Sequence, residues 1–157
     1  GQLSNLQKME QLYEQTGMPL ALDETLWNAS TPEQNSLAAN VSMSWVRALI
    51  LKPGILGGWD STKMWIDHAQ KNGVQIVFSS CFESGLGLNW IAFMAGELLS
   101  ELIPTGLDTS KWFAQDLINP HFSTNQGSYL LPNSWPKAND DLLEQIDDGT
   151  WENGVLD

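Results

Sequence analysis

Polar residues follow three short apolar segments of this chain at a nearly constant spacing. Asp23, Lys52 and Ser79 each come directly after such a segment, at intervals of 29 and 27 residues, and Gly106 comes another 27 residues later. A fixed period of this length indicates a repeated supersecondary unit. One strand and one helix together take roughly 31 residues in an α/β barrel of eight units. The spacing therefore predicts about four β/α units in this chain of 157 residues.

Segments that fit strands alternate with segments that fit helices. We expect strands at 19–22, 45–51 and 74–78, a weaker fourth strand at 104–108, and helices at 4–16, 59–71 and 85–102. Nearly continuous apolar strands between helices are typical of a parallel sheet covered by helices. Beyond residue 110 the pattern becomes rich in loops, with a possible edge strand at 127–131, and the chain ends in an acidic stretch after residue 138.

The charge of the chain limits its partners. Nineteen acidic residues stand against seven basic ones, which gives a net charge of −12 and disfavours binding to nucleic acids and to anionic lipid. No apolar run approaches the roughly 20 residues of a membrane span, and the residues before the first expected helix lack the basic-then-apolar pattern of a secretory leader, so we expect neither feature. The single cysteine favours a reducing compartment, most simply the cytoplasm. Because the chain opens at Gly1 without an initiator Met, we expect a processed chain or a piece of a longer one.

The residues at the expected strand ends can carry chemistry, although each also has a simpler explanation. Active sites of α/β barrels are built at the carboxyl ends of the strands. There Asp23 could bind Mg²⁺, and Lys52 could act as a base or stabilise negative charge. Alternatively, Asp23 is a turn residue, Lys52 is a solvated strand end, and Ser79 with Ser80 begins the next helix.

Four motifs, read in order, point to one family. Residues 19–26 (PLALDETL), 51–58 (LKPGILGG), 79–88 (SSCFESGLGL) and 106–109 (GLDT) resemble the second half of the enolase-superfamily barrel. The likeness is closest to the o-succinylbenzoate synthase family and covers about residues 3–131. It implies that residues 1–109 form the second half of a TIM-type (β/α) barrel. It also implies that residues 110–157 form an extension that packs back toward the barrel or a capping domain.

The resemblance implies roles for individual residues. Asp23 corresponds to the third Mg²⁺ ligand, at the end of the fifth barrel strand. Lys52 corresponds to the lysine of the sixth strand, which lies opposite the base and steadies the negatively charged face of the substrate. The substrate is expected to contact Ser79, Ser80 and the backbone near Gly106. Further candidates around the same mouth are Glu24, Phe82 and Glu83.

The implied enzyme is a magnesium-dependent carbon–oxygen lyase of menaquinone biosynthesis. It would dehydrate 2-succinyl-6-hydroxy-2,4-cyclohexadiene-1-carboxylate to o-succinylbenzoate. The family's Lys-x-Lys base motif and its first two metal carboxylates have no counterpart in this sequence. We therefore expect the chain to need a missing N-terminal half of the barrel and to be inactive alone. Its open sheet edges also make it a candidate for forming oligomers.

Two alternatives stay open. One is N-acylamino acid racemisation or dipeptide epimerisation within the same superfamily, which would use the same lysine and metal. The other is a half-barrel without catalytic activity. The Ser79-Ser80 and Glu83-Ser84 pairs favour the synthase over the racemase or epimerase.

Overall fold

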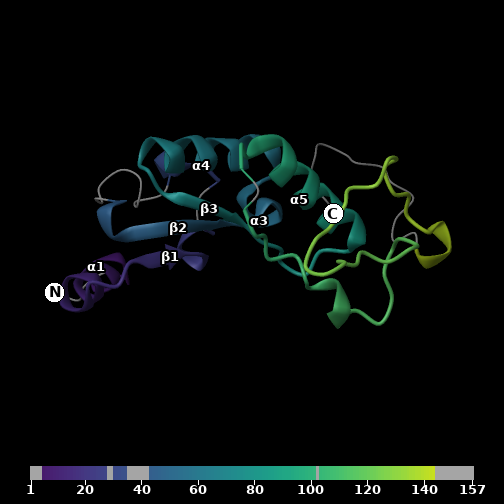
Figure 1. The fold of residues 1–157 in the computed structure, drawn as a ribbon, viewed down its shortest axis with the longest axis horizontal. Helices are drawn as coiled ribbons and strands as arrows, with labels where there is room; N and C mark the ends of the chain where they lie inside the picture. The colour runs from purple at the N-terminus through teal and green to yellow at the C-terminus, as the bar shows by residue number, and fades with distance from the viewer. Residues whose placement is uncertain (1–4, 28–29, 35–42, 102, 144–157) are drawn as a thin grey trace, which may run out of the picture.

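Three parallel strands form an open sheet at the centre of the described structure (Figure 1). The computed structural model describes residues 5–27, 30–34, 43–101 and 103–143. The strands occur in the order β1 (Leu20–Leu22), β2 (Val46–Leu51) and β3 (Gln75–Phe78). The helices are α1 (Asn5–Thr16), α3 (Pro53–Leu56), α4 (Trp59–Lys71) and α5 (Gly85–Leu98). This α/β arrangement confirms the expected parallel sheet and its alternation with helices.

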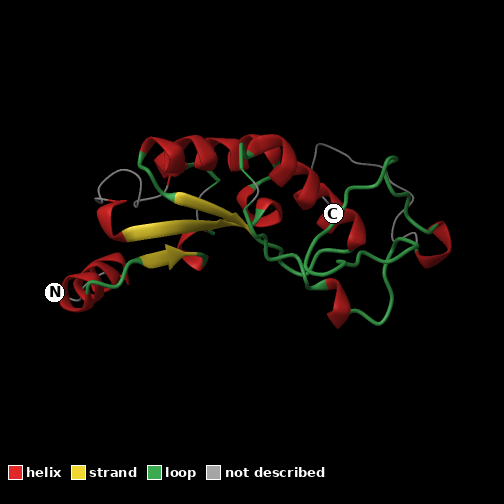
Figure 2. Cartoon of the chain, in the orientation of Figure 1, coloured by secondary structure: helices red, strands yellow, loops and turns green. Residues whose placement is uncertain are grey.

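The helices α4 and α5 lie along one side of the sheet (Figure 2). Successive side chains of a strand point to opposite faces, and the buried face carries the core. Its fully buried members include Leu22, Leu49 and Phe78. The opposite face is more open, because Ala21 is exposed and Val77 is only half-buried. The chain thus builds a core on the helical side and leaves the second face of the sheet accessible.

A β-bulge sets the register between the first two strands. Leu20 pairs with Val46, but the next residue, Ala21, pairs with Ala48, so Arg47 has no counterpart in β1. Val46 is therefore buried while Arg47, beside it, is exposed. Because of the extra residue, Leu49 lies on the core face, as Val46 does. The bulge therefore also determines the side of the sheet to which the side chain after β2 points.

The expected fourth strand is reduced to one bridge. Gly106 pairs in parallel with Ser79, and its N–H donates to the carbonyl of Phe78 at 2.9 Å. Pro104 has no N–H to donate, which limits pairing on its side. No helix like α4 or α5 follows this bridge within the described residues, where two short 3₁₀ turns lie at Ser110–Trp112 and Asp140–Leu142. The described part therefore has three full strands instead of four.

The segment after residue 110 packs against α5. The carboxylate of Asp116 accepts the N–H of Gly85, at the start of α5, at 2.7 Å. Further along the chain, the hydroxyl of Tyr129 donates to Asn89, and burial raises the pKa of this phenol. Trp135 makes an edge contact with Trp90 at 5.5 Å between ring centroids. The acidic end that the sequence predicts lies largely in 144–157, outside the described residues.

Several element boundaries follow the sequence and others do not. The predicted helix 59–71 matches α4, whereas α5 ends at Leu98 instead of residue 102. The possible edge strand at 127–131 is absent from the described structure, where a single bridge joins Asn125 and Ser128.

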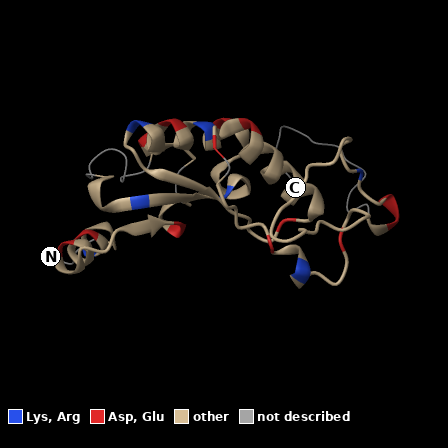
Figure 3. Cartoon of the chain, in the orientation of Figure 1, with Lys and Arg blue, Asp and Glu red and all other residues tan. Residues whose placement is uncertain are grey.

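Charged residues lie mainly on helices and turns, and the sheet is largely uncharged (Figure 3). No described helix is both long enough and apolar enough to span a bilayer.

Because Asp116 approaches α5 closely, there is no space for a side chain at Gly85. A Cβ at Gly85 would meet the Asp116 carboxylate and would lie 2.7 Å from the side chain of Ile118, where it cannot fit. Gly85→Ala should therefore lower the free energy of unfolding by about 1–3 kcal/mol, measured by urea denaturation.

Gly96, in the same helix, is the matched control. A Cβ there would meet only Leu131, at 4.0 Å. Gly96→Ala should leave stability unchanged or raise it by about 0.5–1 kcal/mol, through helix propensity. Equal effects of the two substitutions would contradict the packing described here.

Candidate functional site

Asp23 and Lys52 form an ion pair where two neighbouring strands end. The Nζ atom of Lys52 lies 2.9 Å from Oδ1 and 3.0 Å from Oδ2 of Asp23. Each residue directly follows a residue of the core face, so strand alternation directs both side chains to the open face. The Lys52 side chain is only 13% exposed and that of Asp23 is 30% exposed. Opposite charges are thus held together in a partly desolvated position.

The local backbone fixes Lys52. Pro53 occupies the first turn of α3, where its missing N–H costs nothing and its ring favours helical geometry. The carbonyl of Lys52 accepts the N–H groups of Ile55 and Leu56 at 2.9 and 3.0 Å. The short helix ends at Gly57, whose φ of 99° lies in the left-handed region that suits glycine. The side chain of Lys52 therefore leaves a rigid strand-to-helix junction.

A turn holds Asp23 on the neighbouring strand. The Asp23 carbonyl accepts the N–H of Leu26 at 3.0 Å in the 3₁₀ turn Glu24–Leu26, and Leu26 is fully buried. This turn also brings Trp27 back toward the pair, with its ring centroid 4.9 Å from the Lys52 Nζ. Asp23 thus lies between a strand and an anchored turn, and its position is defined on both sides.

Both oxygens of the Asp23 carboxylate face the Lys52 ammonium. Its Oδ1 is buried and lies 2.9 Å from the Lys52 Nζ, which is its charged partner in the described structure. A buried carboxylate oxygen of this kind fits one position in the oxygen shell of Mg²⁺. No cluster of three or more His, Cys, Asp or Glu side chains forms in the described parts of the chain. Among the described residues, Asp23 could therefore offer a metal ion one carboxylate ligand at this position.

The serines after β3 have different surroundings. Ser79 follows the strand on the open face, as Lys52 does, and its hydroxyl lies 3.3 Å from the Gly106 carbonyl. Ser80 is buried, donates to the same carbonyl at 3.0 Å, and lies 3.0 Å from the hydroxyl of Thr109. A Cβ at Gly106 would lie 3.0 Å from the Ser79 hydroxyl, so glycine leaves room for it. Ser80 thus ties the loop to the next segment, and Ser79 lies closer to the open face.

The three further candidates lie in the turns that follow β1 and β3. Glu24 begins the 3₁₀ turn after Asp23 and is exposed. Phe82 is exposed and has a φ of 61°, a left-handed conformation that is uncommon for a residue other than glycine. The Glu83 carboxylate accepts the N–H of Cys81 at 2.5 Å and reaches the start of α3 near Gly54. Glu83 therefore shapes the loop beside the Lys52 junction.

Sequence reasoning missed Asp116. Its buried carboxylate accepts the N–H groups of Gly85 and Leu117, both at 2.7 Å, at the positive end of the α5 helix dipole. Gly85 and Asp116 lie 31 residues apart in the chain. An acidic residue in a loop-rich segment resembles a surface residue in the sequence, because no local periodicity marks its distant partner. The hydrogen bond from Gly85 shows that Asp116 stabilises the start of α5.

The chain is similar in sequence to several known proteins. No protein-family model matches the sequence. The chain is 36% identical to the o-succinylbenzoate synthase of Vibrio cholerae over 105 residues, which are 67% of this chain and 30% of that protein. It is 34% identical to the synthase of Pasteurella multocida over 128 residues, which are 78% of this chain and 37% of the relative. The chain is homologous to part of the o-succinylbenzoate synthases. It spans about a third of the length of these relatives.

Two further matches agree with this homology. The chloroplastic protein PHYLLO of Arabidopsis thaliana is 28% identical over 130 residues, 74% of this chain and 8% of PHYLLO. A crystal structure of an enolase-superfamily member from Listeria innocua superposes with a TM-score of 0.66 at 23% identity. That match covers 86% of this chain and 36% of the Listeria protein. The structural match supports the fold: the open three-stranded sheet corresponds to part of an enolase-superfamily structure.

The ion pair at the strand ends can be tested by a double-mutant cycle. Asp23→Asn, Lys52→Met and the double variant should give a coupling energy of about 1 kcal/mol in urea denaturation, because the pair is shielded from water.

The pair Lys63–Asp67 on α4 is a matched control, since its atoms are 3.6 Å apart and both side chains are at least half exposed. Its coupling should be about 0.3–0.5 kcal/mol. A coupling between Asp23 and Lys52 no larger than in this control would show that the two charges are not held together.

Proposed function

We propose that this chain supplies the Asp23–Lys52 part of the active site of an o-succinylbenzoate synthase. The observation that carries the proposal is the pairing of these two side chains at adjacent strand ends, in a segment homologous to the synthases. Withdrawing an ammonium and a carboxylate from water costs free energy that packing alone does not require. This cost favours a functional role for the pair. The arrangement suits a reaction in which negative charge develops on a carboxylate substrate.

Dehydration of 2-succinyl-6-hydroxy-2,4-cyclohexadiene-1-carboxylate is such a reaction. The proton beside the carboxylate is removed, the ring hydroxyl leaves as water, and an aromatic ring results. Negative charge gathers on the carboxylate oxygens as the proton leaves, and the Lys52 ammonium would stabilise it. The proton acceptor and the remaining metal ligands would come from barrel strands outside this chain. Lys52 is thus assigned the role of electrostatic stabiliser.

Asp23 would contribute one ligand to a divalent metal, of which Mg²⁺ is the expected one. Its Oδ1 is buried at the strand end beside the Lys52 ammonium, and this position supports the assignment. Mg²⁺, when bound, supplies positive charge at the substrate carboxylate. Ser79 and the backbone at Gly106 lie at the next two positions along the same edge of the sheet, and we assign them to the succinyl end of the substrate.

The partner of this chain would be the rest of a TIM-type barrel. The accessible face of the sheet, with Ala21 exposed and Val77 half-buried, is the face that a closed barrel turns inward. Covering it with the remaining strands would also pair the open edge of β1. The net charge of −12 argues against a nucleic-acid partner, and the pathway we propose, menaquinone biosynthesis, would place the enzyme in the cytoplasm.

A chimera tests the function. The segment of the Vibrio cholerae synthase that matches this chain would be replaced by the present residues, and dehydration would be followed by the loss of diene absorbance. The chimera should dehydrate the substrate. Lys52→Ala should lower kcat by about 10²–10³, as does the loss of one charge-stabilising donor elsewhere.

The control for that substitution is Lys63→Ala, which removes an exposed lysine of α4 and should leave kcat unchanged. Circular dichroism of each variant separates loss of fold from loss of chemistry. A folded chimera that racemises N-acylamino acids or epimerises dipeptides without dehydrating the substrate would overturn the proposal. So would a Lys52→Ala chimera with normal turnover.

The chain of 157 residues alone should neither bind Mg²⁺ tightly nor catalyse dehydration. Mg²⁺ requires near-octahedral oxygen coordination, and the described residues offer it one carboxylate. Isothermal titration calorimetry with MgCl₂ measures this directly, with Asp23→Asn as the comparison. Micromolar Mg²⁺ binding that disappears in Asp23→Asn would contradict the assignment of further ligands to other strands.

A further inference from the structure

Trp27 covers the charged end of Lys52. The ring centroid lies 4.9 Å from Nζ, within the roughly 6 Å over which a cation is attracted to the face of an indole. The carboxylate of Asp23 contacts the same ammonium through both oxygens. The ammonium therefore has an anion and an aromatic ring as its near neighbours, which agrees with the 13% exposure of the Lys52 side chain.

One turn presents both of these neighbours. Asp23 precedes the 3₁₀ turn Glu24–Leu26 and Trp27 follows it, and the Trp27 N–H donates to the Glu24 carbonyl at 3.2 Å. Leu26 is fully buried and anchors the turn in the core. The positions of the carboxylate and the indole relative to Lys52 are therefore set by the same short segment.

Core packing does not account for the indole at this position. Trp27 is 40% exposed, whereas Trp45 and Trp65 are each 1% exposed and belong to the core. A large aromatic side chain that lies over a lysine ammonium while it is itself 40% exposed covers the charge without being buried in the core. This is the geometry of a ring that holds a cation at the surface of a site.

We propose that Trp27 is a positioning residue that fixes the Lys52 ammonium by a cation–π contact. The indole restricts the flexible lysine side chain and keeps the ammonium at the edge of the sheet where Asp23 lies. A lysine that was free to rotate would spend less time in the position from which it can stabilise charge on a substrate. The catalytic consequence rests on the proposed function, whereas the contact itself does not.

The contact is tested by NMR on the 157-residue chain labelled with ¹³C,¹⁵N-lysine. The chain has six lysines, and Lys52→Arg identifies the signal of residue 52 by its disappearance. The Hε protons of Lys52 should resonate upfield of those of the other lysines, because they lie over the indole face. Trp27→Leu should abolish the displacement, and Trp27→Phe should retain part of it.

If a variant fails to fold, the chemical shift of the Lys52 Hε protons in the unmodified chain still tests the contact. Lys52 Hε protons at the same position as those of exposed Lys63 would overturn the proposal, whatever the variants do. A displacement that persists unchanged in Trp27→Leu would overturn it as well, because another ring would then be its cause.

The catalytic consequence is measured in the synthase chimera. Trp27→Leu should lower kcat by about threefold to tenfold with little change in KM, and Trp27→Phe should restore most of the loss. A chimera that lacks dehydration activity while the Lys52 signal is displaced would refute the proposed function and leave the contact intact. An active chimera in which Trp27→Leu has normal kcat would refute the positioning role.

Discussion

The parallel register of three short strands is the constraint on which the site depends. Because β1 and β2 run in the same direction, the residues that follow them, Asp23 and Lys52, emerge at the same edge of the sheet. Asp23 follows Leu22, the partner of Leu49, so Lys52 extends two residues beyond the level of Asp23. The long lysine side chain spans that stagger. An antiparallel arrangement of the same segments would separate the two charges by the length of the strands.

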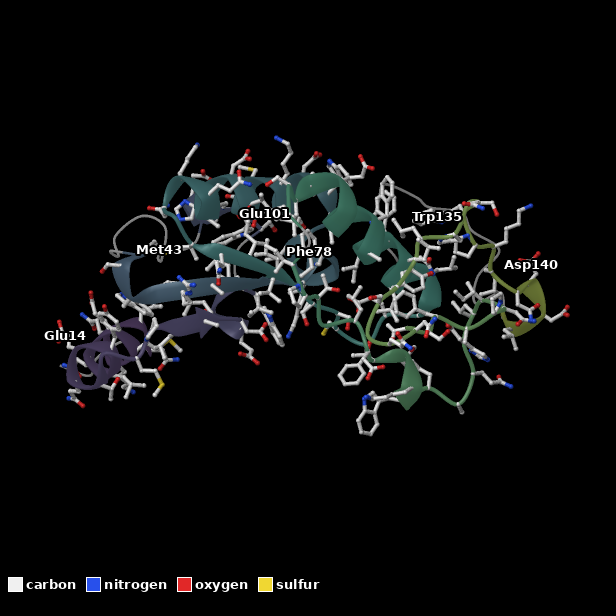
Figure 4. All side chains as sticks on the ribbon, in the orientation of Figure 1. Glu14, Met43, Phe78, Glu101, Trp135 and Asp140 are labelled. Atoms are coloured by element: carbon white, nitrogen blue, oxygen red, sulfur yellow. The ribbon has the colours of Figure 1, made fainter. Side chains whose placement is uncertain are left out.

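The packing around the sheet stabilises this edge from the helical side. Buried Leu51 directly precedes Lys52, and the backbone N–H of buried Leu26 donates to the Asp23 carbonyl, so the strand ends cannot move without disturbing buried side chains. Figure 4 draws the side chains on the ribbon and labels Phe78, a buried residue at the end of β3. Beyond β3, Asp116 holds the start of α5 by accepting the backbone N–H of Gly85. The site is thus open on one face and tightly supported on the other, as expected for a polar edge built on a rigid scaffold.

The sequence predicts those features that arise locally. Helix α4 is recognisable because it contains the apolar residues 64–66 and Asn72-Gly73 ends it. The strand ends at Asp23 and Lys52 follow directly from apolar runs. Features that depend on distant contacts were not predictable. The bulge at Arg47 is a property of two paired strands, and the hydrogen bonds of Asp116 join segments 31 residues apart. The predicted fourth strand was wrong in extent, because pairing there is confined to Gly106.

The central claim is that Asp23 and Lys52 face the same ligand-binding space from neighbouring strands of one barrel. A crystal structure of the synthase chimera with Mg²⁺ and o-succinylbenzoate tests it most directly. The account predicts an Asp23 carboxylate oxygen about 2.1 Å from the metal, and the Lys52 ammonium on the product side of the same cavity. A metal bound without Asp23, or a Lys52 side chain directed away from the product, would contradict it.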